Sequence, residues 1–186
     1  FRADGKTAYV GGNIGKPLLD YVTEGQKADV VIAELSSFQL ELTQRLIPAV
    51  AVFTNLEEDH LDRYPDMDAY TNAKKRLLAA CDKNSYVILN HDSPGIAKFA
   101  NENPGKLLWF TRKDPMSVSG EFAEAFVGCY YNAQTKQVIG KVGGKDETYD
   151  LTQLRLFGDH NKENLMAAIT AARTLGVSQK AIQTVI

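Results

Sequence analysis

Four short apolar runs, separated by stretches of helical character, constrain this chain more than any other feature. The runs are ADVVIAE (28–34), PAVAVFTN (48–55), SYVILN (85–90) and KLLWFT (106–111). Continuous apolar runs rich in valine and leucine are typical of strands buried on both faces of a parallel sheet. Between the first two runs, SSFQLELTQRL (36–46) has the spacing of a helix that packs across neighbouring strands. The pattern predicts an α/β fold in which a mostly parallel sheet carries helices on both faces.

The pattern changes between residues 112 and 156. Short strand-like runs there are joined by glycine-rich or polar turns, which predicts a small antiparallel meander at the edge of the sheet. Helical patterns return at 161–176 and 178–186, with Gly176 as a C-terminal cap and Ser178 as an N-cap. With 186 residues and no recognisable linker, the chain is expected to form a single domain over 1–186.

Composition excludes several classes of function. The formal net charge of −2 offers no basic field for nucleic acid, and no apolar stretch approaches the roughly 20 residues that span a bilayer. Cys81 and Cys129 lack the spacing of a disulfide or metal framework, so we expect reduced thiols and a cytoplasmic location. The chain opens at Phe1 without a methionine and ends within a helical pattern, which suggests an excised piece of a longer protein.

The segment NLEEDHLDRY (55–64) places acids and His60 directly after a buried strand. Ligands in open α/β sheets gather beyond the carboxyl ends of strands, where Glu34 also lies. Acidic groups that share one sheet edge repel one another unless a cation lies between them, and Mg²⁺ takes few protein ligands. We therefore expect a Mg²⁺ site here, although a solvated turn explains the segment if it is considered alone.

Lys74 falls on the apolar stripe of the next helix, in register with Tyr70, Leu77 and Cys81. The simpler interpretation is a lysine whose stem crosses the core while its ammonium reaches water. The alternative is that desolvation favours the neutral amine, which can react with CO₂ to form a carbamate that binds a metal through oxygen.

Two glycine-containing segments resemble phosphate loops. GGNIGKP (11–17) has too short an interval between Gly11 and Gly15, and Pro17 stands where a serine or threonine is needed. DGKT (4–7) matches the end of such a loop, but the extended run TAYVGG follows it instead of a helix, so Asp4 and Gly5 are expected to form a turn into a strand.

GDHNKENLMAA (158–168) places Asn161 and Asn164 three residues apart at a predicted helix start. Their amides can each offer a donor and an acceptor to a purine edge. Helix capping is the alternative role.

Taken together, GGNIG, ELSSFQLE, NLEEDHLDRY, YTNAK and GDHNKEN resemble, in order and spacing, the central ATP-binding domain of the Mur ligases. ELSSFQLE and DHLDRYP are most similar to the members that add D-glutamate to UDP-N-acetylmuramoyl-L-alanine. The resemblance covers nearly the whole chain and is weakest from about 112 to 155. It implies peptidoglycan synthesis through an acyl phosphate, with ATP and Mg²⁺ as cofactors.

The resemblance also implies roles for single residues. Glu34, His60 and a carbamylated Lys74 would bind the metal and serve catalysis. Asn13, Ser36 and Gln39 would face the muramoyl substrate, and Asn161, Asn164 and His160 would lie near adenine. Asp59 matches a motif position, and the turn LNHDSP (89–94) resembles a family turn to which we assign no chemistry.

Some family parts lie outside the sequence. The Walker A strand and helix, the domain that binds uridine diphosphate and the C-terminal domain are missing, so residues 1–186 alone are expected to be inactive and to associate, whereas the full-length ligase is expected to be a monomer. The expected partners are small-molecule substrates only, without nucleic acid or membrane insertion. Two alternatives stay open: a ligase like folylpolyglutamate synthetase, or a non-catalytic nucleotide-binding or scaffold module.

Overall fold

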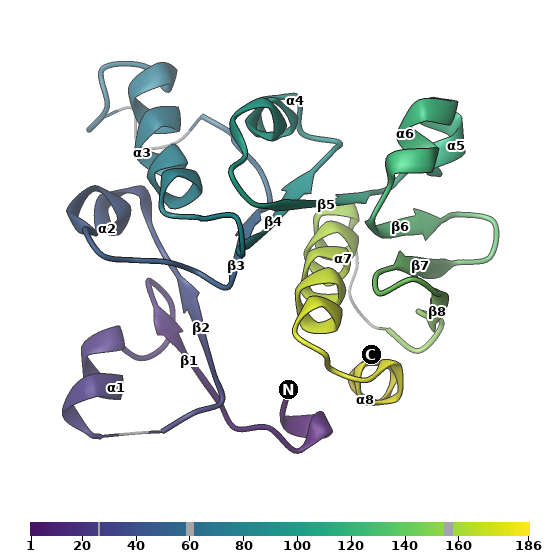
Figure 1. Ribbon diagram of the computed structural model, residues 1–186, viewed down its shortest axis with the longest axis horizontal. Coiled ribbons are helices and arrows are strands. Elements are labelled where there is room, and N and C mark those ends of the chain that lie inside the picture. The colour runs from purple at the N-terminus through teal and green to yellow at the C-terminus, as the bar shows by residue number, and fades with distance from the viewer. Residues whose placement is uncertain (26, 59–61, 155–157) are drawn as a thin grey trace.

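The computed structural model describes residues 1–25, 27–58, 62–154 and 158–186 (Figure 1). Its first part is a parallel pair of strands, β1 (Ala8–Gly12) and β2 (Val30–Glu34), joined through helix α1 (Leu18–Thr23). A short 3-10 helix, η1 (Arg2–Asp4), precedes them. Gly5 ends η1 with a φ of 76°, and β1 follows, which confirms the predicted turn into a strand.

The second part is a six-stranded sheet in the order β3-β4-β5-β6-β7-β8. Strands β3 to β6 are parallel neighbours, whereas β6, β7 and β8 pair antiparallel, as the sequence predicts for the edge meander. The bounds are β3 (Val50–Phe53), β4 (Tyr86–Asn90), β5 (Lys106–Thr111), β6 (Gly128–Asn132), β7 (Gln137–Lys141) and β8 (Asp146–Asp150).

The helices lie between these strands in the chain. They are α2 (Ser37–Leu42), α3 (Met67–Ala79), α4 (Pro94–Ala97), η2 (Lys98–Glu102), α5 (Pro115–Val118), α6 (Gly120–Ala125), α7 (Asp159–Thr174) and α8 (Gln179–Val185). Among the described residues, no helix is long and apolar enough to cross a membrane.

Both faces of the six-stranded sheet are covered by helices. On one face, Ile88 and Phe110 join residues of α7 and α8 in one core cluster. On the other face, Val87 and Leu89 pack with residues of α3, α4 and η2. Because successive strand side chains point to opposite faces, the fully buried run Val87-Ile88-Leu89 contributes to both clusters. This arrangement confirms the predicted fold class.

The prediction for the first apolar run is wrong in one respect. The run at 28–34 is expected to be buried on both faces, yet β2 is largely exposed, with Val31 41% and Ile32 42% accessible. Among the described residues, β2 is hydrogen-bonded only to β1, so its second edge and much of its surface are uncovered. Glu34 consequently ends a strand of the two-stranded sheet, whereas the segment at 55–64 follows β3 of the six-stranded sheet, and the expectation that both lie at one sheet edge is not met.

Candidate functional site

The carboxyl ends of β1 and β2 bring two predicted site residues together. The backbone N–H of Asn13 donates to the Glu34 carbonyl (2.8 Å), and Asn13 Nδ2 donates to Glu34 Oε1 (3.1 Å). Both side chains are exposed. This close approach requires glycine at position 12, where φ is +114° and a Cβ would lie 2.2 Å from the Glu34 carbonyl oxygen. The glycines of GGNIG therefore shape an exposed carboxylate and carboxamide at a strand end.

Ser36 and Gln39, which follow directly, form a capping box at the start of α2. Ser36 Oγ accepts from the Gln39 backbone N–H (3.3 Å), and Gln39 Oε1 accepts from the Ser36 backbone N–H (2.9 Å). Each side chain thus satisfies a donor at the first turn that the helix leaves unpaired. The Gln39 carboxamide is held back against the helix start, three residues beyond Ser36 and close in sequence to Glu34.

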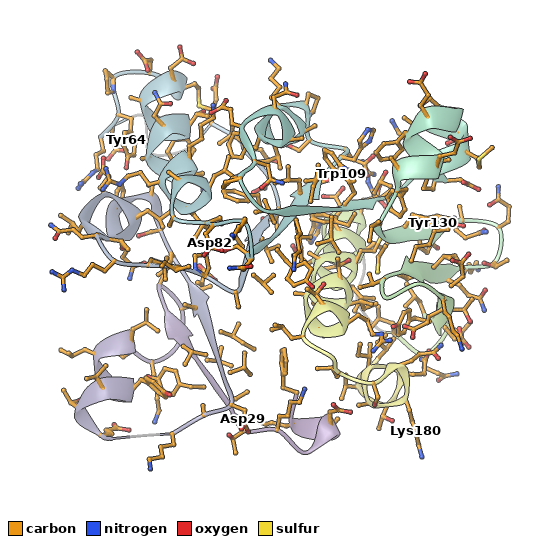
Figure 2. The ribbon with its side chains drawn as sticks, viewed as in Figure 1. Asp29, Tyr64, Asp82, Trp109, Tyr130 and Lys180 are labelled. Carbon is orange, nitrogen blue, oxygen red and sulfur yellow. The ribbon has the colours of Figure 1, made fainter. Side chains whose placement is uncertain are left out.

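Part of the segment predicted to bind metal can be placed. His60 and Asp59 lie outside the described residues. After them in the chain, Tyr64 is buried and stacks on Phe38 of α2, with ring centroids 6.1 Å apart, while the Arg63 guanidinium lies 4.2 Å from the centre of the Phe38 ring. Tyr64, labelled in Figure 2, lies on the side of the molecule where α2 and α3 meet. Tyr64, at the end of the segment, is therefore anchored between these two helices through Phe38 and Tyr70.

Lys74 is half-buried on α3. Its Nζ lies 4.9 Å from the centre of the Tyr70 ring, an arrangement in which the ring face attracts a cation. Lys75 and Arg76 are directed elsewhere: Lys75 pairs with Glu102 at 2.5 Å, and Arg76 Nε donates to the Leu40 carbonyl at 2.9 Å.

In the described part of the chain, no three histidine, cysteine, aspartate or glutamate side chains gather into a group that could hold a metal ion. Glu34 with Asn13 is the oxygen-rich pair that the structure does assemble. Carboxylate and amide oxygens suit Mg²⁺, which keeps several waters and needs few protein ligands. Glu34 and Asn13 therefore fit part of a magnesium site.

The predicted adenine residues lie on the first turns of α7. This helix begins at Asp159, and its N-cap is Gly158, which has no side chain to cap with. Asn161 is therefore not the N-cap residue but the third residue of the helix. Asn161 is partly buried, Asn164 and His160 are exposed, and the three-residue spacing places the two amides on one side of α7.

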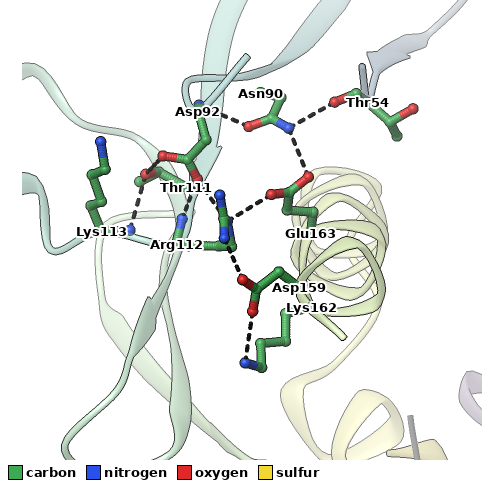
Figure 3. Close-up of polar contacts among 9 residues, drawn as sticks. All are labelled: Thr54, Asn90, Asp92, Thr111, Arg112, Lys113, Asp159, Lys162 and Glu163. Atoms are coloured by element: carbon green, nitrogen blue, oxygen red, sulfur yellow. Dashed lines mark hydrogen bonds and ion pairs between the residues drawn. The ribbon is translucent and has the colours of Figure 1, made fainter. Parts of the chain in front are cut away.

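A polar network that the sequence analysis missed joins α7 to the sheet. It comprises Asn90, Asp92, Thr111, Arg112, Asp159 and Glu163, and we call it the Arg112 network (Figure 3). Arg112 Nε lies 2.7 Å from Glu163 Oε1 and 3.6 Å from Asp92 Oδ2, and Arg112 Nη1 lies 2.6 Å from Asp159 Oδ2. The side chains of Asp92 and Glu163 are only 4% and 17% exposed.

Further hydrogen bonds satisfy the carboxylates of the network. Asp92 accepts from the Thr111 hydroxyl (3.0 Å) and from the Arg112 backbone N–H (2.6 Å). Asn90 Nδ2 donates both to Glu163 Oε2 (3.1 Å) and to the Thr54 carbonyl (2.7 Å). The pKa of Asp159 lies below its ordinary value because Lys162 donates a hydrogen bond to it, with the charges of Lys162 and Arg112 adding to the effect.

The sequence contains one signal for this network. Asn90 ends the buried strand SYVILN, and Asp92 follows it within the turn at 89–94, a position where polar residues often serve a ligand edge. Arg112 lies 20 residues after Asp92, and Glu163 lies 73 residues after Asn90. A local sequence pattern does not indicate contacts between residues so far apart in the chain.

Comparison with known proteins identifies the family. The model of the Mur ligase middle domain matches residues 4–172. The chain belongs to the Mur ligase family. It is 37% identical, over 95% of its length, to the UDP-N-acetylmuramoylalanine--D-glutamate ligase of Geotalea uraniireducens, and 38% identical, over 100% of its length, to that of Symbiobacterium thermophilum. This Mur ligase middle domain spans only 36% and 39% of the lengths of these two relatives.

Solved structures agree on the fold. A UDP-N-acetylmuramoyl-L-alanyl-D-glutamate--2,6-diaminopimelate ligase matches 98% of the chain with a TM-score of 0.68 at 22% identity, and the chain covers 40% of that protein. FolC of Escherichia coli, solved in complex with DHPP and ADP, matches 88% with a TM-score of 0.55 at 20% identity, and the chain covers 35% of it. At these identities, the likeness concerns the fold.

Proposed function

We propose that this Mur ligase middle domain works within an ATP-dependent ligase that adds D-glutamate to UDP-N-acetylmuramoyl-L-alanine, a cytoplasmic step of peptidoglycan synthesis. The observation that carries the proposal is identity of 37–38% to D-glutamate ligases over nearly the whole chain. The expected partners are the small-molecule substrates, and the full-length ligase is expected to be a monomer.

The reaction has to bring two anions together. ATP phosphorylates the substrate carboxylate to give an acyl phosphate and ADP, the amine of D-glutamate attacks the acyl carbon, and the tetrahedral intermediate expels phosphate. In the proposed arrangement, Asn13, Ser36 and Gln39 contact the muramoyl substrate, while Asn161, Asn164 and His160 lie beside adenine. Asn13 and Glu34 already share a strand end, which supports a role for this edge in holding polar ligands.

Bound Mg²⁺ would neutralise the charges of the γ-phosphate and the carboxylate as they meet. Glu34, His60 and Lys74 are the proposed ligands, Lys74 as the carbamate formed when its neutral amine adds CO₂ and loses a proton. The exposed Glu34 carboxylate beside the Asn13 amide supports the magnesium proposal. The half-buried position of Lys74 is compatible both with a modified side chain and with a plain ammonium over Tyr70.

The proposal is tested with the gene product at its native length. ADP formation should require UDP-N-acetylmuramoyl-L-alanine and D-glutamate together, and it should stop when Mg²⁺ is chelated. Intact mass measurement should show a gain of about 44 Da, the mass of CO₂, that is lost in Lys74→Arg. Residues 1–186 assayed alone should turn over poorly, and a normal ligase rate from them would refute that expectation.

Two alternatives are separated by the same assay. Activity with folate-type substrates and L-glutamate, in place of the muramoyl substrate, would favour a ligase like folylpolyglutamate synthetase, whose fold the FolC structure shares. Nucleotide binding without turnover of either substrate pair would favour a non-catalytic module and would contradict the proposed function.

A further inference from the structure

The Arg112 network lies at the edge of the sheet where ligands of open α/β folds are held. Asn90 and Thr111 are the last residues of β4 and β5, and Thr54 follows the last residue of β3. Through Asn90, the network connects Thr54, directly before the segment at 55–64, with Glu163 on α7 (Figure 3). It therefore ties three adjacent strand ends to the first two turns of one helix.

The α7 residues of the Arg112 network lie on a different side of the helix from Asn161 and Asn164. At about 100° per residue, Asp159 and Glu163 lie on one stripe, one turn apart. The same stripe continues into the buried residues Met166, Ala167 and Thr170. Asn164 lies about 100° from Glu163, and Asn161 lies about 160° from it. Any rotation of α7 about its axis would therefore turn both amides by the same angle.

An apolar side chain at position 163 would extend this buried stripe more simply. Burying two carboxylates with one guanidinium carries a desolvation cost, so such groups are often no more stabilising than apolar side chains of the same size. Their hydrogen bonds are directional, however, and the planar guanidinium lies 2.6 Å from Asp159, 2.7 Å from Glu163 and 3.6 Å from Asp92. Unlike an apolar contact, the Arg112 network therefore defines the orientation of α7 about its own axis.

We propose that the Arg112 network is a positioning device that fixes the rotation of the first turns of α7 and so aims Asn161 and Asn164 at adenine. The inference rests on the proposed function for the place of adenine, and the residues of the network act through α7 without touching the nucleotide. An amide pair reads a purine edge only when its donors and acceptors are aligned with it, so loosening the helix start weakens recognition of the base and leaves the phosphates unaffected.

The test uses two conservative variants, Arg112→Lys and Glu163→Gln. Lysine keeps the charge and loses the planar fork, while glutamine keeps the shape and loses the charge. The matched control is Arg173→Lys, at the last turn of the same helix. Arg173 also contacts a partner, Glu147, through two nitrogens at 2.6 and 2.7 Å, with side chains that are 19% and 16% exposed.

The readout is the ratio of kcat/KM for ATP to that for inosine triphosphate, in which an oxygen replaces the amino group on the purine edge. In the native-length ligase, Arg112→Lys and Glu163→Gln should lower this ratio about tenfold, as expected for one misaligned hydrogen bond, mainly through the KM for ATP. Arg173→Lys should leave the ratio within about twofold of wild type, because it removes comparable contacts far from the amides. An unchanged ratio in both network variants, or an equal fall in the control, would overturn the inference.

Hydrogen exchange separates failure of this inference from failure of the proposed function. In the network variants, amides of residues 158–166 should exchange faster than in wild type, whereas Arg173→Lys should leave them unchanged. If wild type does not turn over ATP with the muramoyl substrate, the proposed function fails, and faster exchange confined to the network variants still supports the positioning of α7. Unchanged exchange would overturn it in either case.

Discussion

At the scale of single residues, the two cysteines show how burial sets reactivity. Burial raises the pKa of Cys129 to about 12 and that of Cys81 to about 11. Both are free thiols within the core clusters on the two faces of the six-stranded sheet. The thiolate is the nucleophile, so at about pH 8 only on the order of one molecule in a thousand or fewer carries a reactive form of either residue.

We therefore expect neither cysteine of the folded chain to be alkylated by iodoacetamide at about pH 8, where an ordinary exposed thiol reacts readily. The same reagent in denaturant should label both. Mass spectrometry of the intact chain counts the adducts, and mapped peptides assign them. Rapid labelling of Cys129 under native conditions would show that the sheet core between β6 and α7 opens far more often than its packing implies.

Local and distant contacts differ in how far the sequence could predict them. The Asn13–Glu34 contact joins the ends of two strands that GGNIG and ADVVIAE mark clearly. The reciprocal bonds of Ser36 and Gln39 follow from a spacing of three at a helix start. The Arg112–Glu163 contact depends on how α7 is placed across the sheet, which no local pattern encodes.

At the scale of elements, one side chain near the start of the chain forms hydrogen bonds with the N-terminus of the last helix. Asp4 Oδ1 accepts hydrogen bonds from the Ser178 hydroxyl (2.7 Å) and backbone N–H (3.2 Å), while Ser178 Oγ caps α8 by accepting from the Ala181 N–H (3.2 Å). These bonds from Ser178 hold the pKa of Asp4 below its ordinary value. The carboxylate of Asp4 therefore joins η1 to the N-terminus of α8, where a negative charge is also favoured.

A folded-state pKa below the unfolded one stabilises the fold at pH values above the unfolded pKa, and the contribution is lost as pH falls through the folded pKa. Asp4→Asn should accordingly lower the free energy of unfolding at neutral pH, and the difference from wild type should shrink below about pH 4, the ordinary pKa of aspartate. Urea unfolding of both proteins at several pH values measures this difference. If the difference in unfolding free energy between the two proteins stayed constant down to about pH 3, the stabilising role of the Asp4 charge would be contradicted.

Other elements show where pattern reasoning succeeds and where it fails. The helix at 178–186 and its cap Ser178 are confirmed, and α7 ends close to the predicted Gly176. The short helices α5 and α6 were missed inside the region expected to be a meander. Their caps Asp114 and Ser119 are readable in the sequence, but each helix is too short to show a period.

At the scale of the whole molecule, the two sheets differ in how well they are buried. Strand β4 lies between β3 and β5, and Val87, Ile88 and Leu89 are fully buried beneath helices on both faces. In the two-stranded sheet, Val10, Val31 and Ile32 are 55%, 41% and 42% exposed. An isolated pair of strands is marginally stable in water, because it buries little apolar surface for the backbone that it orders. These exposed side chains also give a physical basis for the predicted association of residues 1–186.

This difference predicts an uneven pattern of hydrogen exchange in residues 1–186. Amides of β4 and β5 should exchange through unfolding of the six-stranded sheet, whereas those of β1 and β2 should exchange through local opening at much lower free energy. Mass spectrometry of peptides from 8–12 and 30–34, compared with peptides from 86–90 and 106–111, measures the two rates. Ile88→Ala should cost about 2 to 5 kcal/mol and speed exchange in β4 and β5 while leaving β1 and β2 nearly unchanged. Equal protection of both sheets in wild type would mean that they unfold as one unit and that the exposed face of β2 is covered in solution.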